Sequence, residues 1–287
     1  MNWTPRRERF RALLAGSRCV HPGSVFDPIS ARIAEDLGYE IGMFAGSIAS
    51  LAVLGAPDLI LLTLMEFAEQ AYRICRAGNL PLLVDADHGY GNALNARRTV
   101  EELETAGVAA LTIEDTVLPR QYRERGAPKL ISTEEAVGKL RAALAGRQDP
   151  GLVIAGRTGA VPVNGVDDAI ARCRAYEAAG VDALFVLGVK TRAQLEPIAA
   201  AVKLPLILGG VGSEIMDLDY LGARGVRICL QGHQPFLAAV KAVHETLHAL
   251  RGGTPPGKLA GLPSDELMKR VTREADYTRW TKDYLGG

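Results

Sequence analysis

The chain has 287 residues, of which 48% are hydrophobic and 23% charged, and its 33 basic and 33 acidic side chains give a formal net charge of zero. No basic stripe accompanies this balance, which excludes the electrostatic footprint of a nucleic-acid-binding protein. The longest apolar stretch, residues 51–65, is broken by Gly55, Pro57 and Asp58, which argues against a membrane span. A charged amino terminus and four cysteines without a CxxC pair predict a reduced, cytoplasmic protein that acts on small molecules.

A short pattern recurs four times along the chain: helical apolar spacing, then a glycine, then a short apolar run. The four glycines are Gly38, Gly107, Gly180 and Gly225. A glycine at this junction adopts φ > 0 and ends the helix, after which the chain enters a strand. Helices that alternate with short apolar strands predict a parallel sheet covered by helices.

In chain order, eight strands are expected at residues 19–23, 40–45, 80–84, 110–113, 152–155, 183–187, 204–208 and 226–230. Eight helices are expected at residues 28–37, 64–77, 93–106, 133–144, 166–179, 191–202, 214–221 and 233–250. Eight of each in alternation predict a closed (β/α)₈ TIM barrel, and an open doubly wound sheet is the alternative.

Two segments lie outside the eightfold set, and we expect all of residues 1–287 to form one domain. Residues 3–14 have helical spacing and are expected to cover the amino-terminal mouth of the barrel. Residues 251–287 form a linker and a helical tail whose apolar residues need a surface to pack against. A neighbouring subunit is one candidate for that surface.

Acidic residues follow two neighbouring strands at the end of the barrel where active sites lie. Asp85 and Asp87 are two residues apart and so share a face, and Glu114 follows the next strand. A hard divalent cation would relieve the repulsion among three carboxylates, and an all-oxygen donor set favours Mg²⁺ or Mn²⁺ over zinc. We interpret the three acids as a metal site; the alternative is that some of them cap helices or pair with nearby arginines.

A basic side chain and a Gly-Ser pair at the same end of the barrel suit a substrate carboxylate. Arg157 ends the fifth expected strand, where its guanidinium can bind a carboxylate through two hydrogen bonds. Its alternative role is to neutralise Glu114 or Asp115. Gly46 and Ser47 end the second strand and offer a hydroxyl and an accessible backbone N–H, although such a pair is often only a turn.

Two histidines are further candidates. His233 begins the helix after the eighth strand, where an imidazole can hydrogen-bond the substrate or move a proton. The alternative is a surface histidine at a helix start. His88 invites the same two interpretations, and Tyr90 and Asn92 lie beside it in a glycine-flanked loop that could bend over a ligand.

The run Asp-Ala-Asp-His-Gly-Tyr-Gly-Asn at residues 85–92, followed by Ile-Glu-Asp at 113–115, resembles the isocitrate lyase / phosphoenolpyruvate mutase superfamily. The similarity extends from residues 26–27 through 46–47 to 157–158. It implies a Mg²⁺ site organised by Asp85, with Asp87 and Glu114 helping directly or through water. It also implies a 2-oxo acid bound through the metal, Arg157 and the backbone at residues 46–47, and a homotetramer that exchanges a carboxy-terminal helix.

Departures from the family pattern narrow the expected chemistry. Residues 119–126 contain no cysteine like that of the lyases for isocitrate and methylisocitrate, and neither the lysine nor the asparagine of the phosphonate-handling members. Gly159 stands where members carry an acid or asparagine. His233 is similar to the histidine that marks the oxaloacetate decarboxylase branch, as is the Asp-Ala-Asp-His sequence.

The resemblance therefore implies Mg²⁺-dependent decarboxylation of oxaloacetate to pyruvate and CO₂ through a metal-stabilised enolate. The alternatives are a C–C lyase for a methylisocitrate-like or substituted malate substrate, phosphonopyruvate hydrolysis, and a catalytically silent barrel that binds a 2-oxo acid. The sequence leaves open which group protonates the enolate and whether the loop at 118–128 closes over the ligand.

Overall fold

The computed structural model describes residues 1–123 and 125–286, so residue 124 of the loop at 118–128 lies outside the described residues. The chain divides into two compact units, Met1–Gly232 and His233–Gly287. The first unit contains the eight strands and helices α1 to α10, and the second contains α11 to α13. The single domain expected from the sequence stays a prediction.

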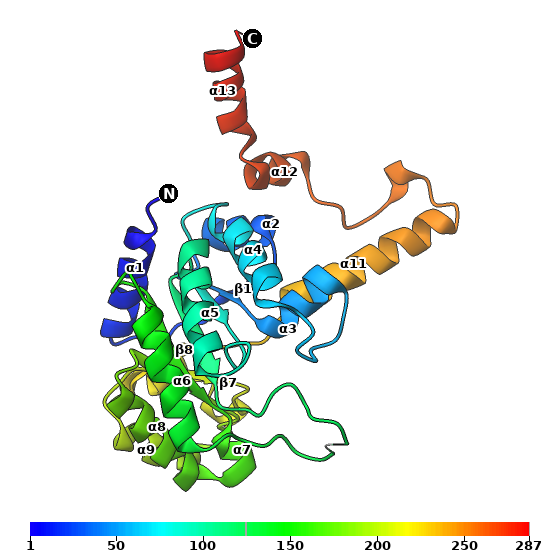
Figure 1. Ribbon diagram of the computed structural model, residues 1–287. Helices are drawn as coiled ribbons and strands as arrows, with labels where there is room; N and C mark the ends of the chain where they lie inside the picture. The colour runs from blue at the N-terminus through cyan, green and yellow to red at the C-terminus, as the bar shows by residue number, and fades with distance from the viewer. Residues whose placement is uncertain (124, 287) are drawn as a thin grey trace. The chain divides into compact units, whose positions relative to one another are not determined.

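The first unit is built on one sheet of eight parallel strands in chain order. These are β1 (Gly23–Ser24), β2 (Gly42–Phe44), β3 (Leu82–Asp85), β4 (Ala110–Glu114), β5 (Val153–Thr158), β6 (Ala183–Leu187), β7 (Leu206–Gly209) and β8 (Val226–Cys229). A parallel bridge joins Val20, just before β1, to Ile228 of β8: the Val20 N–H donates to the Arg227 carbonyl (2.9 Å), and the Cys229 N–H donates to the Val20 carbonyl (3.0 Å). The bridge connects the two ends of the sheet, and the predicted TIM-barrel fold is confirmed (Figure 1).

Helices connect the strands and cover the barrel as predicted. They are α2 (Pro28–Asp36), α4 (Leu64–Cys75), α5 (Ala93–Ala106), α6 (Thr133–Gly146), α8 (Val166–Ala179), α9 (Arg192–Ala201) and α10 (Leu218–Ala223). Gly107 and Gly180 end α5 and α8 with φ of 92° and 97°, a left-handed conformation that a side chain would oppose. The core lies between these helices and the strands, whose inward side chains are almost all buried.

Helix α1 (Thr4–Ala15) covers the amino-terminal ends of β4 and β5, as the sequence predicts. Its arginines reach backbone carbonyls just before these strands: Arg7 Nε donates to the Val108 carbonyl (3.1 Å), and Arg11 Nε donates to the Gly151 carbonyl (2.9 Å). Phe10, on the same helix, is fully buried. The helix therefore closes the end of the barrel opposite the acidic residues.

Several expected boundaries are wrong for local reasons. The ladder to β2 begins only at Gly23, whose N–H bonds the Ile41 carbonyl (3.0 Å), because Pro22 has no N–H to donate. The helix expected at 214–221 starts at Leu218, after a 3₁₀ turn and an Asp217 cap that accepts the Asp219 N–H (2.9 Å). The sequence also missed three short elements: α3 (Gly46–Ala49), the π-helical turn η1 (Ser50–Leu54) and α7 (Ala160–Asn164).

The second unit consists of α11 (Gln234–Arg251), a 3₁₀ turn and two helices, α12 (Asp265–Thr272) and α13 (Glu274–Leu285). Helix α11 buries no side chain. One of its faces carries exposed apolar side chains at helical spacing: Leu237, Val240, Val243 and Leu247. None of the helices in the described part of the chain combines the length and apolar character needed to cross a membrane.

Candidate active site

Asp85 is the last residue of β3 and points into the barrel mouth beside the next two strands. Its Oδ1 accepts hydrogen bonds from Thr112 Oγ1 (3.1 Å) and from the Asp87 N–H (3.3 Å). Its Oδ2 accepts a hydrogen bond from Arg157 Nη1. The residue is 9% exposed, so the carboxylate is fixed by neighbours on β4 and β5 rather than directed into solvent.

Arg157 joins the acids of two strands. It lies opposite Glu114 in the register of β4 and β5, and Arg157 Nη2 approaches Glu114 Oε2 to 3.1 Å. Its guanidinium lies over the Phe185 ring, 5.4 Å from the ring centre. Arg157 Nε has no hydrogen-bond acceptor among the described residues. The arginine is thus held by two carboxylates, and its Nε–H is buried without an acceptor among the described residues.

The expected alternative partner of Arg157, Asp115, belongs to a separate network. Asp115 is 1% exposed, and its Oδ2 accepts hydrogen bonds from Tyr176 Oη (2.7 Å) and Arg172 Nη1 (3.1 Å). Its Oδ1 accepts the Gly159 N–H (3.3 Å) after β5. Asp115 therefore ties β4 to α8 and to the loop after β5, and Arg157 neutralises Glu114 instead.

Asp87 is brought against Gly46, a contact that only glycine permits. Asp87 has a left-handed backbone with φ of 46°, and its carbonyl accepts the Glu114 N–H (2.8 Å). A Cβ added at Gly46 would lie 2.6 and 2.7 Å from the two carboxylate oxygens of Asp87. Ser47 follows Gly46 in the first turn of α3 and is partly buried. The first unit thus brings Asp85, Asp87, Glu114 and Arg157 together, with Gly46 against Asp87.

The crowded acids perturb one another. Burial raises the pKa of Asp87 well above its usual range; the Asp85 and Glu114 carboxylates add to the rise, and Arg157 opposes it. Burial also raises the pKa of Glu114, and the Arg157 guanidinium opposes that rise. The cause is physical: ionised carboxylates lose hydration and repel one another in a buried mouth. A cation bound among them would favour their ionised forms.

Asp58 is a member of this cluster that the sequence analysis missed. Asp58 is exposed, but partial desolvation raises the pKa of its carboxyl; the Asp85 carboxylate adds to the rise and Arg157 opposes it. Asp58 therefore lies within electrostatic range of both groups. The sequence analysis used Asp58 only as a break in an apolar stretch. Its place in the loop after β2, at the carboxyl end of the barrel, was the signal that could have identified it.

The donor set fits a hard divalent cation held partly by water. Among the residues that the structure describes, no three His, Cys, Asp or Glu side chains are arranged to hold a metal ion on their own. Mg²⁺ usually keeps several waters and is bound through one or two carboxylates plus ligand oxygens. Asp85, with its neighbours Asp87 and Glu114, can supply those carboxylates, and the assignment of these three residues to the metal stays a prediction.

The remaining candidates occupy different positions. Burial lowers the pKa of His88 to about 4, so its imidazole is neutral near pH 7. Within the described chain, His88 Nδ1 and Tyr90 Oη are buried without a hydrogen-bond partner. Asn92 caps α5 by accepting the Leu94 N–H (2.9 Å). His233 is the first residue of the second unit, at the N-cap position of α11, so its role toward the acids stays a prediction.

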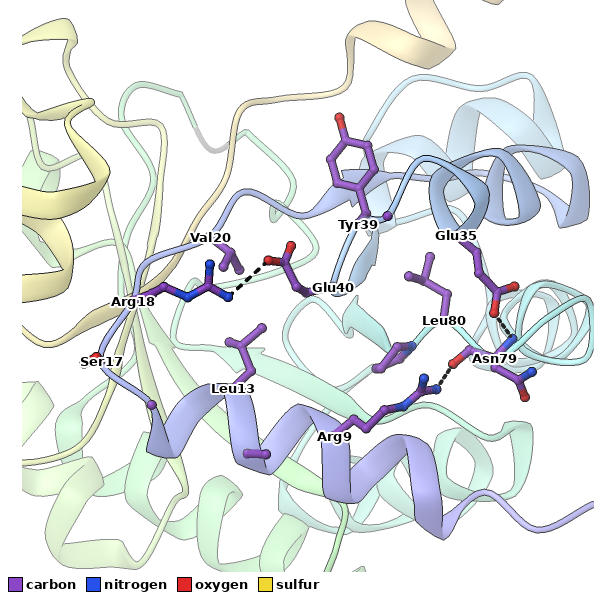
Figure 2. A pocket seen from close by; sticks show the side chains of 14 residues that line it. Arg9, Leu13, Ser17, Arg18, Val20, Glu35, Tyr39, Glu40, Asn79 and Leu80 are labelled. Carbon is purple, nitrogen blue, oxygen red and sulfur yellow. Dashed lines mark hydrogen bonds and ion pairs between the residues drawn. The ribbon is translucent and has the colours of Figure 1, made fainter.

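A cavity of about 630 Å³ lies elsewhere in the first unit, between α1 and the segments that precede β2 and β3 (Figure 2). Its charged side chains already have partners: Arg18 pairs with Glu40 (3.6 Å), and Arg9 and Glu35 bond the backbone of Asn79. It contains none of the predicted site residues. The chemistry therefore collects at the opposite end of the barrel.

The chain is similar to known proteins over nearly its whole length. Residues 10–251 match the family model described as phosphoenolpyruvate phosphomutase. A relative from Rhodopseudomonas palustris (strain BisB18), named oxaloacetate decarboxylase, is 62% identical over 286 residues, covering 100% of this chain and 99% of the relative. The structure of oxaloacetate acetylhydrolase with 3,3-difluorooxalacetate matches with a TM-score of 0.86 at 27% identity, covering 99% of this chain and 98% of the other. Phosphonopyruvate hydrolase with oxalate and Mg²⁺ matches with a TM-score of 0.84 at 29% identity, covering 98% and 99%.

Proposed function

Because the chain belongs to the phosphoenolpyruvate phosphomutase family, we propose that it is a Mg²⁺-dependent oxaloacetate decarboxylase that forms pyruvate and CO₂. The full-length relative at 62% identity carries the activity in its name and is the observation on which the proposal depends most. The cluster of Asp85, Glu114 and Arg157 supplies matching chemistry, because it combines hard oxygen donors with a guanidinium.

The chain's own residues bind and orient the substrate. When bound, a divalent cation supplies a Lewis acid that stabilises negative charge on the 2-oxo oxygen as CO₂ leaves. Asp85, with Asp87 and Glu114, would hold that cation. Arg157 is fixed by Asp85 and Glu114, and its guanidinium would bind a substrate carboxylate.

Further contacts would complete substrate binding in this proposal. The backbone at Gly46 and Ser47, in the first turn of α3, would hold a second carboxylate oxygen. His233 would hydrogen-bond the substrate at C2 and then the enolate. If His233 is catalytic, His233→Ala should lower the decarboxylation rate at least about tenfold, which corresponds to an increase of about 1.4 kcal/mol in the activation free energy. An unchanged rate would return His233 to a surface role.

Product analysis tests the reaction itself. The purified protein with Mg²⁺ and ¹³C-labelled oxaloacetate should produce pyruvate and CO₂ in equal amounts when followed by NMR. The alternative functions give other outcomes: oxalate with acetate would indicate C–C hydrolysis, and cleavage of a substituted malate into two organic fragments would indicate a lyase. Mg²⁺-dependent binding of oxalate without turnover of any of these acids would indicate a silent barrel.

We further propose that the enzyme is a cytoplasmic homotetramer. The four cysteines are free and buried, which suits a reducing compartment. The apolar face of α11, defined by Leu237, Val240, Val243 and Leu247, supports an assembly because such a face is stabilised by burial against another surface. Light scattering should give four times the chain mass, and Val240→Lys should lower it; a wild-type monomer would contradict this proposal.

A further inference from the structure

A buried lysine lies behind the acid cluster. Lys139 is on α6, in the outer layer of the barrel, where lysines are usually in solvent, yet it is only 3% exposed. Lys139 lines a narrow gap between α6 and strands β4 and β5 together with Glu114 and Arg157, and the gap has no room for a water molecule. The lysine therefore lies near Glu114, on the side of the strands that α6 covers.

The acids around Lys139 favour its charged form, against the effect of burial. Burial lowers the pKa of Lys139, while Glu135, Glu114 and Asp115 oppose that change. Asp115 already has direct partners in Arg172 and Tyr176. Among the described residues, the Lys139 ammonium makes no direct ion pair of its own. Its charge thus acts through space, and Glu114 is the active-site acid that it faces.

The charges at this end of the barrel explain what a cation in this position would do. Four carboxylates share the mouth, namely Asp58, Asp85, Asp87 and Glu114. Two fixed cations, Arg157 and Lys139, oppose them. When all four carboxylates are ionised, two negative charges remain, which is the charge that one divalent ion neutralises. Without Lys139 the cluster would carry a third.

We propose that Lys139 is a positioning residue whose ammonium, beside Glu114, holds the metal-free acid cluster together and weakens its attraction for the divalent cation. This inference rests on the metal site of the proposed function. Weaker binding by the protein suits a cation that must also bind substrate oxygens. Lower repulsion within the cluster keeps Glu114 and Asp85 in place around Arg157 before the cation binds.

The test is a Mg²⁺ titration of the full-length, EDTA-stripped protein by calorimetry at pH 8.5, with melting temperatures measured with and without Mg²⁺. Lys139→Met removes the charge and keeps the length of the side chain; Lys139→Arg keeps the charge; Lys203→Met removes a charge from an exposed lysine remote from the acids. We expect Lys139→Met to lower the metal-free melting temperature, to tighten Mg²⁺ binding about three- to tenfold and to enlarge the stabilisation by Mg²⁺. The two controls should bind Mg²⁺ like the wild type.

A purely structural lysine predicts the opposite sign, because a damaged site binds its cation more weakly. Unchanged or weaker Mg²⁺ binding by Lys139→Met would therefore overturn the proposal, as would the same tightening in Lys203→Met. Lys139→Gln provides a second uncharged variant should Lys139→Met not fold, and it must show the same tightening. A wild-type protein that binds no Mg²⁺ would refute the metal site itself, whereas normal wild-type binding without tightening would refute only the role of Lys139.

Discussion

The contact between Gly46 and Asp87 predicts that a single methyl group disables the site. In Gly46→Ala the new Cβ would lie 2.6 and 2.7 Å from the Asp87 carboxylate oxygens. Ordinary contact needs about 3.5 Å, so the carboxylate must move by roughly 0.8 Å. Its backbone cannot follow easily, because the Asp87 carbonyl holds the Glu114 N–H at 2.8 Å and its φ is 46°.

The expected loss follows from this displacement. A misplacement of about 1 Å at a catalytic group costs about 100-fold in rate, or about 2.7 kcal/mol. Crowding of this kind also costs about 1–3 kcal/mol of folding stability. We therefore expect Gly46→Ala to lower kcat/KM for oxaloacetate about 100-fold and to weaken Mg²⁺ binding measured by calorimetry.

Gly138→Ala is the matched control. Gly138 lies in the middle of α6, and an added Cβ there meets nothing within 4 Å. This change should leave kcat/KM unchanged and stabilise the helix by about 0.4–1 kcal/mol. If Gly46→Ala keeps kcat/KM within twofold of the wild type, the carboxylate of Asp87 is not placed by Gly46 and the reasoning is wrong.

Three further predictions concern the charges around the site. Folding raises the pKa of Asp87, so the folded state loses stability as pH rises through this raised pKa and the carboxyl ionises. Metal-free Asp87→Asn should therefore have a higher melting temperature than the wild type at pH 8 and the same melting temperature in acid. It should also bind Mg²⁺ more weakly than the wild type. Arg172→Met leaves buried Asp115 without its cation and should cost about 3–5 kcal/mol in urea unfolding; a loss below 1 kcal/mol would contradict the buried network. Tyr176→Phe removes one hydrogen bond to the same carboxylate and should cost about 1.5–3 kcal/mol, less than Arg172→Met in the same assay.

The barrel was predictable because its local signals are repeated. Gly107 and Gly180 end helices with positive φ, as their place before apolar runs indicates. The element boundaries that were predicted wrongly depend on which strands pair with one another, and the spacing of apolar residues does not show this. The segment before β1 bonds to two different strands. Val20 pairs with β8, and the pairing with β2 begins only after Pro22, which has no N–H to donate. Short elements such as α3 were missed because four residues give no helical periodicity.

The part of the site that was predictable from the sequence is the part formed by residues at the ends of strands. Asp85, Glu114 and Arg157 end or nearly end successive strands, so a parallel sheet places them at one mouth. The contacts of Arg157 with both Asp85 and Glu114 were not predictable, because they depend on the strand register that places Arg157 opposite Glu114. Lys139 left no signal, because a lysine in an amphipathic helix ordinarily indicates a solvent-exposed face.

The most direct test of the central claim is whether oxaloacetate loss requires a divalent cation held at Asp85. The EDTA-stripped protein should consume oxaloacetate no faster than buffer does. Added Mg²⁺ should restore a rate well above that of Mg²⁺ in buffer without protein, with pyruvate formed in equal amount, and Asp85→Asn should abolish the gain. A wild-type rate that is the same with and without Mg²⁺, or an Asp85→Asn variant as fast as the wild type, would contradict the account.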